Sequence, residues 1–68
     1  MPKFKLKDAR NGQFFWRYEA DNGEVICNSE TYVSKQSALH SIDLVKQTAN
    51  AAPVVDETVR RAVGSYRL

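Results

Sequence analysis

The first half of the chain contains three short segments in which apolar and polar residues alternate, as they do in half-buried β-strands. These segments are residues 3–7, 13–20 and 24–28. In the first segment Phe4 and Leu6 share one face and lysines occupy the other, and in the second the apolar face includes Trp16 and Tyr18. Because turn-forming residues at positions 8–12 separate these two segments, the pattern predicts consecutive antiparallel strands.

The Asn-Gly pair at residues 22–23 predicts a tight hairpin between the second and third strands. Two registers are open. A two-residue loop would place Val25 and Cys27 on the same face as Trp16, whereas a three-residue loop with a glycine bulge would place Ile26 there. We predict the three-residue loop, because Ile26 is the best core residue of the three.

A single amphipathic helix is predicted after the strands, from about Lys35 to Asn50, with Ser34 as its N-cap. Positions spaced by three or four residues form a stripe with one lysine among apolar residues: Ala38, Leu39, Ile42, Val45, Lys46 and Ala49. The other side is polar: Lys35, Gln36, His40, Asp43 and Gln47. A helix packed on one face of a three-stranded antiparallel meander gives an α+β fold of order β-β-β-α.

The end of the chain is harder to assign. The helix must end before Pro53, since proline favours an extended residue before it. Asp56 could then cap a short helix over residues 57–63, although a fourth strand or a frayed end is equally consistent with the pattern. We predict one domain over residues 1–58 and a C-terminal tail over residues 59–68.

The length of 68 residues is enough for one domain only. A domain of this size buries only roughly 60% of the surface that its unfolded chain exposes, so marginal stability is expected. Cys27 is the only cysteine and His40 the only histidine, which excludes an intrachain disulfide and argues against a Cys/His metal cluster. We therefore expect no cofactor, and association with a second copy becomes the main route to added stability.

Charge narrows the function classes only slightly. Ten basic and eight acidic residues give a net charge of +2, which is too even for a strong nucleic-acid prediction. No apolar run approaches the ~20 residues of a membrane span, and the basic N-terminal residues are not followed by the apolar run of a signal peptide. A single unpaired cysteine fits a reducing compartment, so we expect a cytoplasmic protein that does not contact membranes.

A combination of residues that runs from the second strand into the helix points to a family. The residues of this combination are Gly12, Phe14, Trp16, Asn22, Gly23, Glu24, Ile26, Ser29, Glu30, Tyr32, Ser34, Lys35, Ala38 and Ile42. With them the chain resembles, over about residues 3–58, the YegP-like family of small uncharacterised bacterial and archaeal proteins (domain of unknown function 1508). The family usually has Asn-Gly before the helix isoleucine, where this chain has His40-Ser41.

The resemblance implies a β-β-β-α repeat that occurs singly or as a tandem pair. This chain would be a single-repeat member, and single copies are expected to form homodimers that imitate the pair. No biochemical function is established for the family, so the resemblance carries over no active site.

Two sets of residues are candidates for binding. The first is a basic sheet face opposite the predicted core, with one aromatic residue: Lys3, Lys5, Lys7, Phe15 and Arg17, with Val25 and Cys27 nearby. It could bind nucleic acid, form a dimer contact or simply be solvated. The second is a possible ligand site at the helix N-terminus, where free backbone N–H groups attract anions: Tyr32, Ser34 and Lys35.

We predict no catalytic residue, because His40 has only Ser37 and Ser41 nearby as possible nucleophiles and Cys27 has no second cysteine beside it. The preferred interpretation is a non-enzymatic module that forms a homodimer through an open edge strand. The alternatives are a nucleic-acid-binding module that uses the basic face, or a small-ligand binder near the helix N-terminus. The last is the weakest, since a chain this short has little room for a pocket of ~300 Å³.

Overall fold

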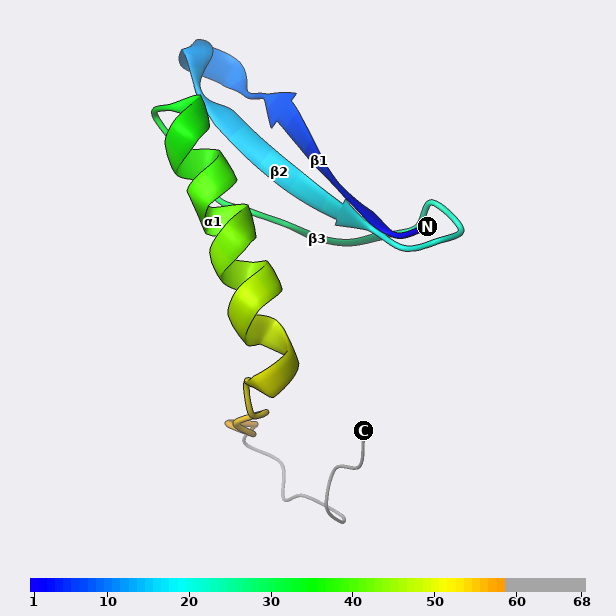
Figure 1. Cartoon of the computed structure of the whole chain (residues 1–68). Helices are drawn as coiled ribbons and strands as arrows, with labels where there is room; N and C mark the ends of the chain where they lie inside the picture. The colour runs from blue at the N-terminus through cyan, green and yellow to red at the C-terminus, as the bar shows by residue number, and fades with distance from the viewer. Residues whose placement is uncertain (59–68) are drawn as a thin grey trace.

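A computed structural model describes residues 1–58 as three strands followed by one long helix (Figure 1). The strands are β1 (Lys3–Asp8), β2 (Phe14–Glu19) and β3 (Val25–Asn28). The helix α1 (Lys35–Thr48) ends in the short 3-10 turn η2 (Ala49–Ala51), and η1 (Arg10–Gly12) joins the first two strands. The predicted β-β-β-α order is confirmed. Of the short helix considered over residues 57–63, residues 57 and 58 are described and are not helical, and the rest of that segment lies outside the described residues.

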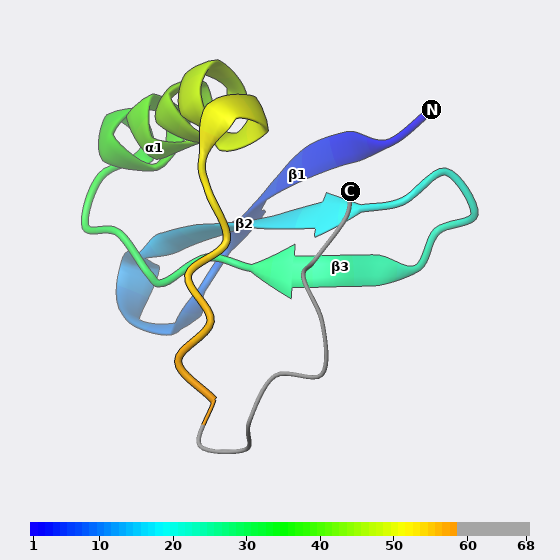
Figure 2. The same ribbon diagram turned by 90° about the horizontal axis from the view of Figure 1, so that it is seen from below.

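The strands form an antiparallel sheet in the order β1-β2-β3, so β2 is central and β1 and β3 are its edges. Leu6 lies opposite Trp16 and Phe4 opposite Tyr18, which gathers the apolar side chains of β1 and β2 on one face. The helix α1 lies over this face, nearest to β1 and β2, and hardly reaches β3 (Figure 2). The two faces of the first hairpin are therefore those that the alternation predicts.

The β2–β3 turn has the predicted three-residue loop. The Gly23 amide donates a hydrogen bond to the Ala20 carbonyl at 2.9 Å, and the Ala20 amide donates to the Glu24 carbonyl at 2.8 Å. Gly23 has a φ of 87°, a conformation that glycine adopts without a Cβ penalty. Asn22 supports the turn, since its side-chain oxygen accepts the Glu24 amide at 3.0 Å.

A second irregularity, beyond the turn, reverses the predicted facing of β3. Glu19 lies opposite Val25, but its neighbour Tyr18 lies opposite Cys27, so Ile26 is an extra, bulged residue. The prediction that Ile26 is buried beneath the helix is wrong, because its side chain is 58% exposed. Cys27 shares the face of Tyr18 instead of the basic face, since a bulge shifts the register by one residue.

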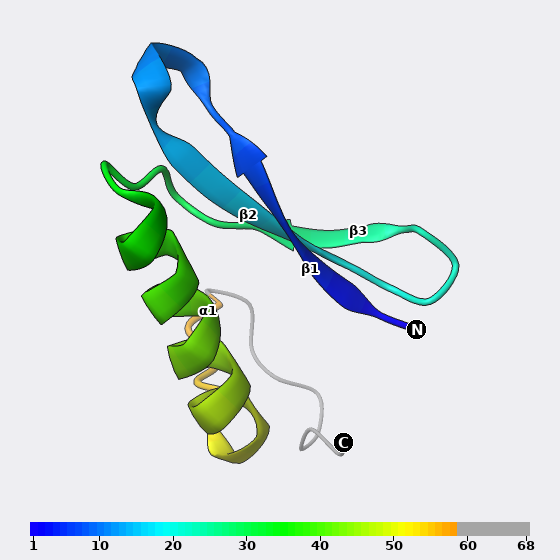
Figure 3. The same cartoon turned by 45° about the horizontal axis from the view of Figure 1, so that its top comes forward.

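The core lies where α1 crosses β2. Trp16, Ala38 and Ile42 are 6%, 0% and 9% exposed. The apolar stripe predicted on the helix includes residues that are not buried, because Leu39 is 45% exposed and Ala49 is also exposed. The helix is longer than the region of sheet beneath it, and its C-terminal half projects beyond the twisted strands (Figure 3).

The indole of Trp16 is fixed from two sides. Its Nε1–H donates to the Ser41 hydroxyl at 2.7 Å, and that hydroxyl donates to the Ala38 carbonyl at 2.7 Å. Phe4 packs edge-on against the indole, with ring centroids 5.3 Å apart and an interplanar angle of 73°. Ser41, which stands where the resembling family usually has glycine, thus supplies the hydrogen-bond partner of the largest core side chain.

The start of α1 has the predicted N-cap. The Ser34 hydroxyl accepts the Ser37 amide at 3.0 Å and donates to the Ser37 hydroxyl at 2.9 Å. Ser34 itself has an extended backbone, as a capping residue does.

Replacing Ser34 with alanine is expected to lower the free energy of unfolding by about 1 kcal/mol, because one amide of the first helical turn loses its acceptor. Urea denaturation followed by far-ultraviolet circular dichroism measures the change. Ser34→Asp is the matched control and should retain most of the stability, since a carboxylate also caps. Equal loss in both variants would contradict the capping role.

Candidate functional site

The β1–β2 register brings together all five residues predicted for the basic surface. Lys3, Lys5 and Lys7 lie opposite Glu19, Arg17 and Phe15 respectively, on the face of the sheet that points away from α1. We call this surface the lysine face, and its residues are Lys3, Lys5, Lys7, Phe15 and Arg17. Val25, opposite Glu19, also lies on this side, whereas Cys27 does not.

The charges of the lysine face are only partly neutralised. Lys5 forms an ion pair with the buried Glu19, with 3.2 Å between Nζ and Oε1. Arg17 donates from Nε to the Asn28 side-chain oxygen at 3.1 Å, and its guanidinium carbon lies 6.0 Å from the centre of the Phe15 ring. Within residues 1–58, Lys3 and Lys7 form no ion pair, so their ammonium groups are available to a partner.

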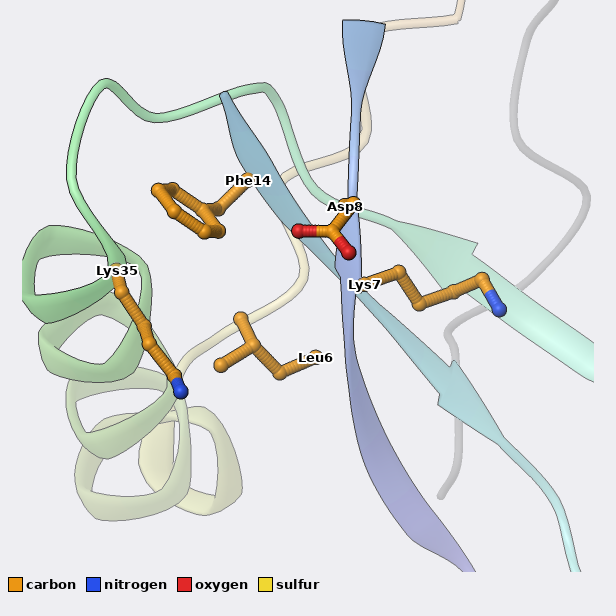
Figure 4. Close-up of a pocket in the computed structure, with 5 residues that line it drawn as sticks. All are labelled: Leu6, Lys7, Asp8, Phe14 and Lys35. Atoms are coloured by element: carbon orange, nitrogen blue, oxygen red, sulfur yellow. The ribbon is translucent and has the colours of Figure 1, made fainter. Parts of the chain in front are cut away.

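A hollow of about 450 Å³ lies between the end of β1 and the start of α1. Figure 4 shows the Phe14 ring, Leu6, the Asp8 carboxylate and Lys35 around a common space, while Lys7 extends away from it. The hollow is larger than expected for so short a chain. Asp8 and Lys35 are exposed, so a small zwitterion could only be held loosely there.

The predicted ligand residues do not converge on one hollow. Lys35 lines the first hollow, whereas Tyr32 and Ser34 line a second, more open depression of about 700 Å³ beside the first half of α1. His40 and Ser41 border this second depression. The two hydroxyls nearest to His40 in sequence already have structural partners: the Ser37 hydroxyl accepts from the capping Ser34, and the Ser41 hydroxyl accepts from the Trp16 indole. This argues against a serine nucleophile activated by the histidine.

A structural role for Ser29 could not be predicted from sequence. Its hydroxyl accepts the Trp16 amide at 2.9 Å and donates to the Glu30 carbonyl at 2.7 Å. Further along, Phe14 and Tyr32 exchange two backbone hydrogen bonds, of 2.9 and 2.7 Å. The segment from Ser29 to Tyr32 thus continues the pairing of β2 beyond β3. The sequence pattern could not predict these contacts, because the partners are 13 or more residues apart.

The edge strand β3 presents uncovered apolar side chains. Val25 is 44% exposed, and Ile26 and the thiol-bearing Cys27 are also exposed. The other edge, β1, carries lysines at alternate positions, which discourage strand pairing. β3 is therefore the less protected of the two edges.

Two further properties concern the described residues as a whole. Among residues 1–58, no three histidine, cysteine, aspartate or glutamate side chains come together as metal ligands would. Neither α1 nor the short turns of this part of the chain have the length and apolar character needed to cross a bilayer.

Comparison with known proteins points to one family. A family model described as "Domain of unknown function (DUF1508)" matches residues 9–56. A UPF0339 protein of Agrobacterium fabrum is 37% identical over 62 residues, which are 91% of this chain and all of that protein. The UPF0339 protein YegP of Yersinia pestis is 41% identical over 46 residues, 68% of this chain but only 41% of that longer protein.

The fold also matches a solved structure. The solution structure of a protein from Haloferax volcanii superposes with a TM-score of 0.74 at 32% sequence identity. The match covers 81% of this chain and 93% of that one. The strands and helix described above are therefore shared beyond this chain.

Proposed function

Since this chain belongs to the DUF1508 family, which is uncharacterised, we propose that it is a non-enzymatic module that forms a homodimer through the open edge of its sheet. The observation that carries the proposal is the β3 edge, where apolar side chains are exposed and no further strand of the described residues pairs. An exposed strand edge is a template for a strand of a second chain.

The chemistry of the two edges favours β3 over β1 as the contact. A second copy that approached β1 would bring its own Lys3, Lys5 and Lys7 close to these lysines, and like charges across paired strands repel. The sequence of β3, Val-Ile-Cys-Asn, contains no charged residue, so two β3 strands would not repel each other in this way. The uncovered side chains of Val25 and Ile26 would leave water on contact, at roughly 25 cal/mol per Å² of apolar surface buried.

The bulge at Ile26 determines what kind of contact this is. A bulge bends a strand and interrupts its ladder, so few backbone hydrogen bonds can form along four residues. Burial of the outward Ile26 side chain would then supply much of the contact energy.

The longer relatives support a paired arrangement. The segment shared with the Yersinia pestis protein is 41% of that protein, and the segment shared with a Pseudomonas aeruginosa relative is 43%. Each of these chains therefore has room for a second copy of the segment. A homodimer of this chain would place two copies side by side in the same way.

Size-exclusion chromatography with light scattering is expected to give twice the 7.7 kDa chain mass at micromolar concentration. Ile26→Lys should convert the dimer to a monomer, because it places two ammonium groups at the contact. Val33→Lys is the matched control, since Val33 is 82% exposed and lies outside β3, and it should leave the mass unchanged. A wild-type monomer, or equal dissociation in both variants, would overturn the proposal.

Cys27 offers an independent test of the same contact. In an antiparallel β3–β3 pair centred on the middle of Val25–Asn28, the two Cys27 residues would be close to the two-fold axis. A short bis-maleimide should then join the wild-type chains and not those of Ile26→Lys. The exposed thiol also fits a reducing compartment, on which ground we propose a cytoplasmic location.

A further inference from the structure

We propose that the lysine face binds single-stranded nucleic acid, with the lysines of β1 on successive phosphates and Phe15 and Arg17 beneath a base. This surface lies on β1 and β2, away from the β3 edge, so the inference does not depend on dimer formation.

The first support is the concentration of charge. The lysine face carries four cationic side chains, and Glu19 is the acidic residue that shares it. Glu19 is buried and paired with Lys5, so it exposes little negative charge of its own. The face thus has more positive charge than the +2 of the whole chain, and it complements a polyanion.

The second support is the spacing of the cations. Lys3, Lys5 and Lys7 alternate along one strand, and a strand rises ~3.3 Å per residue, so neighbouring lysines are about 6.6 Å apart. This spacing is comparable with that of successive phosphates in an extended single strand. Since Lys3 and Lys7 form no ion pair within residues 1–58, contact with phosphate costs them no existing partner.

The third support is the aromatic residue among the charges. Phe15 is half-buried on this outer face, where it does not contribute to the core beneath α1. The Arg17 guanidinium is 6.0 Å from its ring centre and is held in place by Asn28. Aromatic rings and guanidinium planes both stack on unpaired bases, as they do in sheet-based RNA-binding domains.

This aromatic residue selects a single strand over a duplex. In a duplex the base faces are stacked on one another and cannot reach a ring on a sheet surface. A duplex would therefore contact only the lysines, whereas a single strand would contact the lysines and the Phe15–Arg17 pair.

Fluorescence anisotropy with a labelled oligouridylate of about 12 nucleotides, a typical length for such domains, tests the proposal. Binding is expected at about 50 mM salt and should weaken steeply towards 200 mM. The variant Lys3→Glu/Lys7→Glu should bind weakly and lower the log–log salt slope by about 1.4 units, for two lost phosphate contacts. Lys5 is left unchanged, because its ion pair supports Glu19.

The matched control is Lys35→Glu/Lys46→Glu, which changes the net charge equally on α1 and should bind like the wild type. Phe15→Leu should weaken binding at least about fivefold without changing the salt slope, since a stacking contact is not electrostatic. Circular dichroism and Trp16 fluorescence establish that each variant is folded.

Four results would overturn the proposal: no binding at about 50 mM salt, equal loss in the two charge-reversal variants, equal affinity for a duplex of the same length, or binding to anionic vesicles without binding to the oligonucleotide.

Discussion

Replacing Trp16 with alanine is expected to remove most of the stability of the domain. The truncation of a buried tryptophan costs about 3–5 kcal/mol, and a chain of this size rarely has more than that to lose. Trp16 is 6% exposed and meets Phe4 from the strand side and Ser41 from the helix side. Its removal therefore separates the two layers of the fold.

The measurement is urea denaturation at one fixed protein concentration, because a dimer links stability to concentration. Phe15→Ala is the matched control, since it truncates the neighbouring aromatic residue on the opposite, half-buried face of the same strand. It should cost clearly less than Trp16→Ala. Similar losses for the two variants would mean that the helix does not cover the Trp16 face.

The faces of the first hairpin could be predicted because two local signals agree. The alternation in β1 and the alternation in β2 each separate apolar from charged side chains, and the turn at residues 10–12 pairs them without a shift. The lysine face follows directly from this register. Hydrophobic periodicity is reliable where both strands are half-buried and regular.

The facing of β3 could not be predicted by the same reasoning. The Asn-Gly turn forms as expected, but the bulge at Ile26 lies after it and has no signature in the sequence. The preference for a buried isoleucine assumed that the helix covers all three strands. Because α1 covers mainly β1 and β2, Ile26 gains little from facing inward, and Leu39 is only partly covered.

The polar segment at the start of the helix shows a second limit of prediction from sequence. Tyr32, Ser34 and Lys35 are close in sequence, yet Lys35 borders one hollow while the other two border another. Ser34 and Lys35 are adjacent in sequence at the start of α1, yet they line different hollows. Sequence proximity therefore predicted the Ser34 cap, which is a local contact, and could not predict a shared pocket, which is not.

Replacing Ser41 with alanine is expected to lower the free energy of unfolding by about 1–3 kcal/mol, because the part-buried Trp16 N–H loses its acceptor. Ser41→Gly should cost about 1 kcal/mol more than Ser41→Ala, since glycine is unfavourable in a helix. The two variants together therefore separate the loss of the hydroxyl from the loss of helix propensity.

A double-mutant cycle separates this hydrogen bond from other effects of the serine. In a Trp16→Phe background there is no indole N–H to satisfy, so adding Ser41→Ala should cost almost nothing, as measured by urea denaturation. Thr48→Ala is the matched control: the Thr48 hydroxyl also donates to a carbonyl in its own helix, but it serves no distant donor, and its loss should stay within about 0.5 kcal/mol. If Ser41→Ala lowers the free energy of unfolding as much in the Trp16→Phe background as in the wild type, Ser41 acts within the helix alone. The aromatic face of β2 would then be held against α1 by packing, without a contribution from this hydrogen bond.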